Sequence, residues 1–464
     1  MISGLAGPYR SLPRAAAAAA FVALLAAAPP VRAADDPTLP ETPVPLKELP
    51  KRTPPLLELG DDFLGTGTLG KGFTLPTGAV WQPSLFAWGV LRSAIHGIWE
   101  SGTEERSQWA NRLDLFGQLS LTPTERVVIG FRPLDQNGRF SGYTFSPDAL
   151  RGTVNELNAE IDTLYFEGDF GELFPKLDPK DSKGLDYGFG VGRMPVIAQD
   201  GMLVGDPIDS AGVVRNTMRP RGTSNLRVTG MFGWGNVHRG GDNVEDPSAR
   251  LYALFSEVDV RKSQIAFDVA YVDSGEKGDA LYAGLSATQR IASERINTVV
   301  RVLVSAPAGE DTSAVGSGVL VFGTASITPQ STHDLAYLSL FAAFDNYTPA
   351  ARAAGTGGPL VNAGILFEGS GVGAWAPVLS NRSKDVLGGA LGYQRFWNGA
   401  RTQLVLEAGA REETEATRSL SGALGCRLQQ ALGKRFIVRL DTFALAREAL
   451  ELRYGGRAEV LLKF

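Results

Sequence analysis

The amino-acid sequence predicts an all-β fold, a transmembrane antiparallel β-barrel of about 18 strands, with short periplasmic turns and long extracellular loops. Three observations predict it. Apolar and polar residues alternate over repeated runs of roughly ten residues, long enough for a tilted strand to cross a membrane. The breaks between these runs are short and long in turn. The last run ends at an aromatic residue, Phe464.

The C-terminal run, residues 454–464, shows the alternation most clearly. One face would carry Tyr454, Gly456, Ala458, Val460, Leu462 and Phe464. The other would carry Gly455, Arg457, Glu459 and Lys463, with Leu461 as the exception. This pattern resembles the last strand of bacterial outer-membrane barrels, where the terminal aromatic residue belongs to the signal that the barrel assembly machinery reads. The alternative is an amphipathic edge strand of a soluble sheet.

The first residues predict export from the cytoplasm. Arg10 and Arg14 precede an apolar stretch at 15–28, and small or neutral residues before residue 34 suit signal cleavage, so residues 1–33 are expected to be a signal peptide. Residues 34–80 are rich in Pro and Gly and lack periodicity, which predicts a flexible periplasmic segment. The barrel would then occupy residues 81–464.

Charge and cysteine content exclude some classes of protein. Without the three arginines of the predicted signal, 42 basic residues face 50 acidic ones, a balance that argues against a nucleic-acid partner. Cys426 is the single cysteine, so no internal disulfide is expected; its face of the strand should contact lipid. Beyond the signal there is no run of 18 apolar residues.

The alternating runs divide the chain in order. They start near residues 84, 109, 126, 157, 185, 207, 224, 249, 264, 279, 295, 316, 333, 384, 401, 418, 435 and 451. Short turns are expected near 122–125, 261–264, 291–294, 329–333, 398–400 and 431–434, and long loops near 135–156, 195–206, 235–248, 273–279, 306–316, 346–383 and 412–417. The runs near 207 and 316 are the weakest, so a barrel of about 16 strands stays open.

Aromatic residues at the run ends predict girdles at the two membrane interfaces. They are Trp109, Tyr165, Trp234, Tyr271, Tyr347, Trp397 and Tyr454. The glycine-rich stretch 65–72 approaches a phosphate-binding loop, but Gly72 stands where that loop needs Ser or Thr. The three histidines show no metal-ligand spacing, and no nucleophile motif is present. We therefore expect no cofactor, no metal and no enzyme activity.

The inward face should carry the chemistry of the lumen. By alternation the pore-lining residues are Arg112, Asp114, Arg132, Glu160, Asp162, Arg193, Arg227, Arg301, Glu407, Arg439, Asp441 and Arg457. Arginine exceeds carboxylate on this face, and a ring of arginines in a narrow pore lowers the barrier for anions. The alternative is that these charges pair across strands and only keep the lumen wet. A register slip of one residue would reassign a whole face.

The stretch 185–206 resembles the alginate-export family of outer-membrane porins. The resemblance rests on a strand ending in Gly192-Arg193, followed by a loop with Asp200-Gly201 and Val204-Gly205-Asp206, and on Asp162-Thr-Leu-Tyr165 upstream. It implies an 18-strand monomeric barrel whose arginine-rich lumen is narrowed by loops. It places Arg193 at a constriction and Asp200 and Asp206 in the constriction loop. Where the family has a polar residue after Gly-Arg, this chain has Met194-Pro195. This difference argues against alginate itself as the solute.

These observations predict a passive outer-membrane channel for hydrophilic, anionic or sugar-like solutes. Loops 195–206 and 346–383 are expected to fold into the lumen, since a barrel of this width otherwise leaves an open hole. The expected partners are outer-membrane lipid and lipopolysaccharide, the assembly machinery, and a small hydrophilic or polyanionic solute. Two other functions stay open: a sheath that holds a partner protein, and a barrel enzyme acting on lipid or polysaccharide.

Overall fold

The computed structural model describes most of the chain beyond residue 52. The described residues are 53–60, 70–100, 102–136, 138–180, 184–309, 312, 314–330, 332–415, 419–447 and 452–464. The predicted signal peptide, 1–33, lies outside them. Of the predicted periplasmic segment, 34–80, only 53–60 and 70–80 are described, and of the glycine-rich stretch 65–72 only the last three residues are. These domain boundaries stay predictions.

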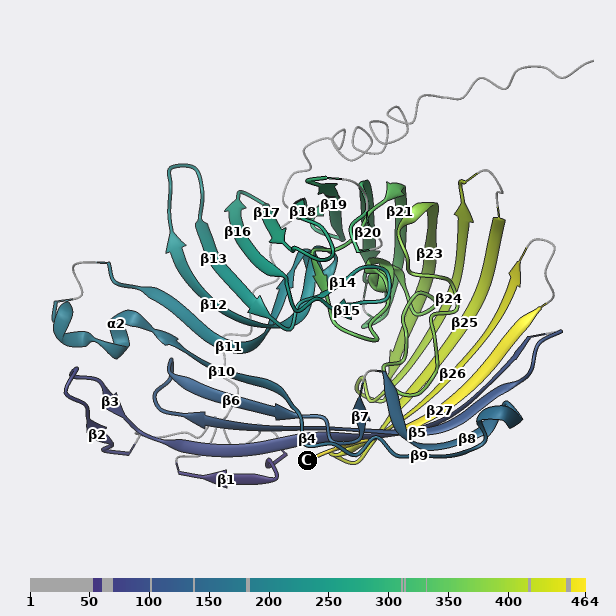
Figure 1. Cartoon of the computed structure of the whole chain (residues 1–464), viewed down its shortest axis with the longest axis horizontal. Helices are drawn as coiled ribbons and strands as arrows, with labels where there is room; N and C mark the ends of the chain where they lie inside the picture. Colours follow the sequence, from purple (N-terminus) through teal and green to yellow (C-terminus); the bar gives the residue numbers. More distant parts are fainter. Residues whose placement is uncertain are drawn as a thin grey trace, which may run out of the picture.

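Eighteen antiparallel strands form the wall of a closed barrel, which confirms the predicted fold class and strand number (Figure 1). They are β4 (Ser84–Glu100), β5 (Arg106–Ser120), β6 (Arg126–Phe131), β10 (Ile161–Asp169), β11 (Tyr187–Ala198), β12 (Val204–Met218), β13 (Asn225–Gly235), β16 (Arg250–Val260), β17 (Ser263–Asp273), β18 (Ala280–Ile291), β19 (Ile296–Pro307), β20 (Gly318–Ile327), β21 (Leu335–Asn346), β23 (Lys384–Trp397), β24 (Thr402–Glu413), β25 (Ser419–Leu432), β26 (Phe436–Arg447) and β27 (Arg453–Lys463). Most start within three residues of the predicted positions.

The first and last wall strands close the barrel. β27 pairs with β4 from Arg453 opposite Glu100 to Lys463 opposite Val90. The backbone of Phe464 extends this ladder through two hydrogen bonds with Gly89, of 2.8 and 3.1 Å. Beyond that point β1 (Leu57–Leu59) takes over as the neighbour of β4, pairing with residues 85–87. The C-terminal aromatic residue therefore lies in the seam of the barrel.

Side chains alternate across the wall as the period of two requires. On β24, Leu406 is about half exposed on the outside, whereas the neighbouring Glu407 is buried inside. Leu254, Leu285 and Leu424 are exposed on the outer surface in the same way. In a transmembrane barrel this outer surface contacts hydrocarbon, so the exposed leucines cost nothing there. Within the described residues no helix has the length and hydropathy needed to cross a membrane.

Part of one predicted loop forms a strand of the barrel wall. The predicted loop 135–156 contains β8 (Arg139–Ser146), which pairs with β5 in line with β6, and β9 (Gly152–Val154), which pairs with β8. The third wall strand is thus split by an excursion that carries β7 (Asp135–Gln136). Phe140, Tyr143 and Phe145 continue the strand after this break, and the break hid them from a search for uninterrupted alternation.

The other connections follow the predicted lengths with one exception. Residues 261–262, 292–295 and 433–435 are short turns at one end of the barrel. At the same end, however, β10 and β11 are joined by residues 170–186, which include α2 (Phe170–Leu173) and a 3-10 turn at Pro175–Leu177. The carboxylate of Asp169 caps α2 by accepting from the backbone N–H of Gly171 at 2.8 Å.

The lipid-facing assignment can be tested with one charge on each face. We expect Leu406→Arg to lower the free energy of unfolding by ~2–4 kcal/mol, because it places a cation in hydrocarbon near the middle of β24. Gln264→Arg, on the inner face of β17, should change the free energy of unfolding little. Denaturant titration of the protein folded in lipid vesicles measures both, and equal losses would contradict the assigned faces.

Candidate functional site: a plugged lumen

The hairpin of β11 and β12 leaves the wall and enters the lumen. Pairing of β11 with β10 ends at Arg193, and pairing of β12 with β13 ends at Asp209, so residues 194–208 continue as a free hairpin. At its tip the amide of Gln199 donates to Asp268 of β17 at 2.8 Å. The carboxylate of Asp200 forms an ion pair with Arg301 of β19. The predicted constriction loop 195–206 thus reaches the inner faces of β17 and β19.

The loop after β21, residues 346–383, is the second inward segment. The buried carboxylate of Glu407 accepts hydrogen bonds from the backbone N–H groups of Ile365 and Leu366, at 2.9 and 2.8 Å, and from the hydroxyl of Tyr337. Arg411 of the same strand donates to two backbone carbonyls of the loop, at 2.9 and 2.7 Å. Glu407 is therefore an anchor for the loop and does not line a passage.

The two segments bind each other and form one unit, called the plug here: residues 194–208 and 346–383. β22 (Ala351–Arg352) pairs with Val204–Gly205 of β12. The hydroxyl of Tyr347 donates to the carbonyl of Met202 at 2.9 Å. Arg352 donates to the carbonyl of Gly201 at 2.6 Å, and burial lowers the pKa of Arg352 to about 10, so it stays charged at neutral pH. The plug is held by backbone pairing as well as by side chains.

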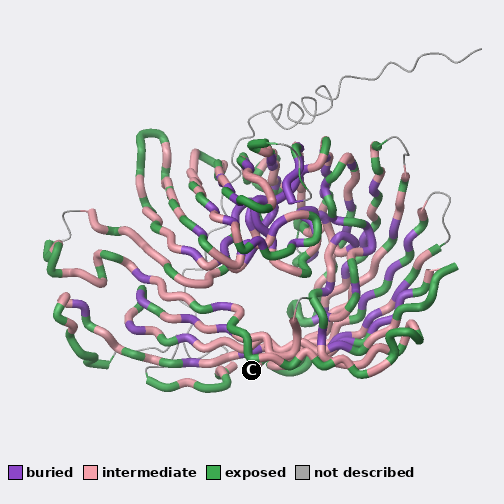
Figure 2. Tube along the Cα trace, viewed as in Figure 1, coloured by how far each residue is buried: buried purple, intermediate pink, exposed green. Residues whose placement is uncertain are grey.

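A dry core joins the plug to one sector of the wall. On the inner face of β16–β21 Leu251, Tyr282, Leu303, Leu320 and Phe322 are buried. They belong to one cluster with residues of the plug, among them Met202, Leu203, Leu360 and Phe367. Figure 2 shows the buried positions gathered around the plug and the neighbouring ends of these strands. Burying this apolar surface is the main stabilisation of the plug.

Tyr347 belongs to this core, and its predicted place in an interface girdle is wrong. It is 2% exposed, whereas Trp109, Trp234 and Tyr454 lie exposed on the outer surface as the girdle hypothesis expects. Tyr347 and the exposed girdle residues all stand at the ends of alternating runs, so their positions in the sequence do not distinguish them. Only the inward path of the loop that follows β21 decides which surface the ring contacts.

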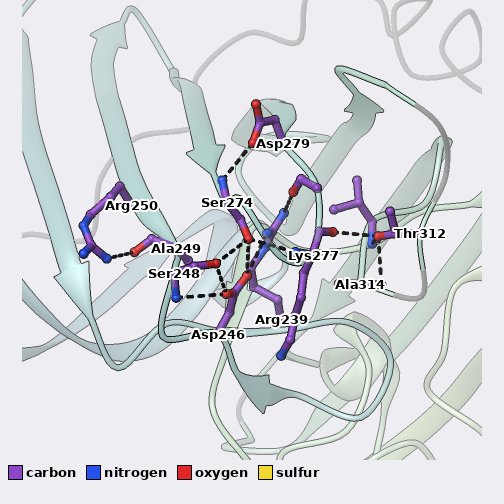
Figure 3. Close-up of polar contacts among 12 residues, drawn as sticks. Arg239, Asp246, Ser248, Ala249, Arg250, Ser274, Lys277, Asp279, Thr312 and Ala314 are labelled. Carbon is purple, nitrogen blue, oxygen red and sulfur yellow. Dashed lines mark hydrogen bonds and ion pairs between the residues drawn. The ribbon is translucent and has the colours of Figure 1, made fainter.

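A third loop, residues 236–249, packs beside the plug and carries a buried ion pair (Figure 3). Arg239 and Asp246 are 3.1 Å apart, both with no exposed side-chain surface. Asp246 also accepts from the hydroxyls of Ser248 and Ser274 at 2.8 Å each. Burial alone would raise the pKa of Asp246, but these hydrogen bonds and Arg239 hold it below its ordinary value. The carboxylate is therefore ionised and ties the loop to Ser274, the residue that directly follows β17.

Asp206, a predicted constriction residue, links this loop to the plug. Its buried carboxylate accepts from the backbone N–H of His238 at 2.8 Å and lies 3.0 Å from the Nδ1 of the same residue. β14 (His238–Arg239) is the short strand in which His238 lies. Asp206 therefore holds the loop and does not face a passing solute, unlike Asp200, whose side chain is 65% exposed.

Arginines gather on the inner face of β4 and β25–β27, away from the β16–β21 sector that packs against the plug. This arginine cluster consists of Arg92, Arg427, Arg439 and Arg457 with Glu368, Asp441 and Glu459. Asp441 lies 2.6 Å from Arg427 and 3.0 Å from Arg457. Glu459, which has no exposed side-chain surface, contacts Arg92 at 2.5 Å and Arg439 at 3.6 Å. Glu368 of the plug pairs with Arg427 at 2.8 Å. Four guanidinium groups against three carboxylates leave one positive charge.

The other predicted pore-lining residues are mostly paired as well. Arg112 binds Asp114 at 2.8 Å, Arg132 binds Asp162 at 2.9 Å, and Arg193 binds Asp209 at 2.7 Å. Glu160 accepts a hydrogen bond from Gln136. Arg227 is exposed and makes no side-chain hydrogen bond or ion pair among the described residues. Arg92 was missed by the sequence analysis, although it lies directly opposite Arg112 on the neighbouring strand.

No protein-family model matches the chain, and no curated protein matches it in sequence. Solved structures match in fold. OccK5 (OpdH) of Pseudomonas aeruginosa superposes with a TM-score of 0.55 at 10% identity, over 82% of this chain and 98% of its own. OccAB3 of Acinetobacter baumannii gives 0.54 at 12%, over 82% and 99%. OpdK of P. aeruginosa, solved with vanillate, gives 0.52 at 13%, over 82% and 98%. At these identities the likeness establishes the fold alone: the chain has the barrel fold of outer-membrane porins.

The anchor at Glu407 predicts how the plug responds to its loss. We expect Glu407→Ala to give larger and noisier single-channel currents, because it leaves two backbone N–H groups and a buried hydroxyl without an acceptor, at ~1–3 kcal/mol each. Glu407→Gln keeps one carbonyl oxygen as an acceptor and should lie close to the unmodified protein. Currents of Glu407→Ala that match the unmodified protein would show that the plug does not depend on this anchor.

The contact between Asp206 and His238 predicts a pH dependence. Burial alone would lower the pKa of His238, but the hydrogen bond and charge of Asp206 raise it above 6.5. The folded protein therefore holds this proton more tightly than the unfolded chain does. The stabilisation is complete below about pH 6.5 and is lost as the pH rises through the higher pKa of the folded state.

We expect the unmodified protein to melt at a higher temperature than His238→Gln at about pH 6, and this difference to shrink toward about pH 9. The loss of heat-resistant migration in gels measures both melting temperatures. His333→Gln, a change of an exposed histidine at the opposite end of the barrel, is the matched control. A difference in melting temperature that grows with pH would contradict the raised pKa assigned to His238.

Proposed function

We propose that the protein is a passive channel of the bacterial outer membrane that lets small hydrophilic solutes cross down their concentration gradients. The observation that carries this proposal is a closed barrel with an apolar outer surface and a charged lumen that a plug narrows. The short turns, the start of β4 and the end of β27 would lie on the periplasmic side, and the long loops outside. The porin fold of the structural neighbours supports this location.

The solutes are proposed to be uncharged or anionic. The arginine cluster carries one surplus positive charge, which favours anions only weakly because every guanidinium in it already has a carboxylate partner. The lumen charges therefore serve first to hold the wall and the plug. The neighbour OpdK was solved with vanillate, an anion, which fits a lumen of this kind.

The finer resemblance to alginate-export porins stays a proposal. Its charged residues all have structural contacts: Arg193 with Asp209, Asp200 with Arg301, and Asp206 with His238. At the hairpin tip a Cβ on Gly205 would lie 3.0 Å from the Gly201 backbone, so this motif also needs its glycine. The motif is thus explained by the inward hairpin, and it supports a narrowed lumen more than it supports one particular polysaccharide.

The proposal assigns no reaction and no cofactor to the chain. Among the described residues there is no group of three or more His, Cys, Asp or Glu side chains that could hold a metal ion. A sheath around a partner protein would need an open lumen, whereas here the plug occupies part of it. Lipid and lipopolysaccharide are the proposed partners of the outer surface, and the assembly machinery the proposed partner of the C-terminal strand.

Reconstitution in planar bilayers under a salt gradient tests the proposed function. We expect stable ion-conducting channels with a reversal potential of weak anion preference, because the arginine cluster carries a net positive charge. Arg112→Gln should shift the reversal potential toward cations, since it leaves Asp114 without its cation. The conservative Arg112→Lys should keep the sign. Cation preference of the unmodified channel would contradict a role of the arginine cluster in selectivity, and the absence of channels would favour a sheath.

A further inference from the structure

A polar cavity lies beneath the tip of the plug hairpin, on the side of the lumen away from the arginine cluster. It has a volume of about 200 Å³ between the tip and the inner faces of β13 and β16–β19, and it is open to the lumen on one side. Gln199 and Asp200 form its roof, and Arg227, Glu257, Gln264 and Thr288 stand on its wall. This space, called the tip cavity here, has room for a single sugar ring.

The roof of the tip cavity is fixed, whereas its wall has unused hydrogen-bonding capacity. Gln199 and Asp200 are held by Asp268 and Arg301, as described above. By contrast, Arg227, Glu257, Gln264 and Thr288 make no side-chain hydrogen bond or ion pair within the described part of the chain. Arg227 and Glu257 are direct neighbours in the register of β13 and β16, yet they do not pair. The Oε1 of the buried Gln199 also lacks a donor.

This arrangement differs from the arginine cluster in both pairing and charge. In the cluster each guanidinium has a carboxylate partner, so little capacity remains for a solute. In the tip cavity free donors and acceptors stand side by side. Three carboxylates, of Asp200, Glu257 and Asp268, face two guanidinium groups, of Arg227 and Arg301, which leaves one negative charge. A small anion is therefore disfavoured there, while the cation of Arg227, which forms no ion pair, disfavours a small cation.

We propose that the tip cavity binds the ring of a neutral sugar, which rests on and sharpens the proposed channel function. Sugar hydroxyls both donate and accept, so they can donate to Glu257 and accept from Arg227 while Gln264 and Thr288 bond in either sense. The half-buried ring of Phe255, which also lines the cavity, offers an apolar surface to the C–H face of the sugar. A solute that leaves bulk water would thus regain its hydrogen bonds beside the plug.

Calorimetric titration of the full chain in detergent with D-glucose tests this site without requiring conduction. The double variant Gln264→Leu with Thr288→Val removes two free polar groups and breaks no contact within the protein. We expect it to bind glucose at least about ten-fold more weakly than the unmodified protein, a loss of about 1.4 kcal/mol. Thr324→Val, on the same face of β20 as Phe322 but outside the cavity, is the matched control and should bind normally.

Three outcomes decide the matter. Equal glucose affinity in the double variant and the unmodified protein would overturn the proposed site. Binding of D-glucuronate without any binding of D-glucose would also overturn it, because such binding would point to the arginine cluster. Glucose binding that depends on Gln264 and Thr288 supports the site even if bilayers show no ion current. In that last case the channel proposal fails and the sugar site stands, so the two failures can be told apart.

Discussion

The backbone hydrogen bonds between β27 and β4 are the interaction on which the rest of the structure depends. In hydrocarbon no water can satisfy the edge of an open sheet, so a transmembrane sheet must close. Closure fixes the register all the way around, and the register fixes which side of each strand meets lipid. Leu406 outside and Glu407 inside follow from that one constraint. So does the place of Phe464, whose backbone continues the closing ladder along Gly89.

Closing a barrel of this size creates a second problem, because the wall side chains cannot fill the space they enclose. The chain fills it with the plug, and the backbone of the plug must then be satisfied far from bulk water. Glu407, Arg411 and Arg352 do this with charged groups that bind backbone N–H and C=O groups. The apolar inner face of β16–β21 supplies the packing. One sector of the lumen is consequently a protein core, and only the remainder is available to water.

The division of the lumen explains why its charges have different tasks. Arg427, Asp441, Arg457 and their neighbours form a closed network that braces β25–β27 against the plug. Such pairs hold geometry well but leave a solute few groups to bind. Under the hairpin tip, by contrast, Arg227 and Glu257 stand beside each other and form no ion pair. We therefore propose that selectivity in this lumen depends on unpaired groups more than on the total number of arginines.

Alternation with a period of two determined much of this protein from its sequence. It gave the strands, their number, the inward direction of Arg457 and the outward direction of Leu406, because each follows from neighbours in the chain. It could not show that Glu407 anchors a loop, that Tyr347 enters a core, or that Asp206 binds His238. Those roles depend on the path of the plug, and that path is decided by contacts between residues more than 30 positions apart. The sequence predicts the face of the strand on which a side chain lies, and only the tertiary structure decides what covers that face.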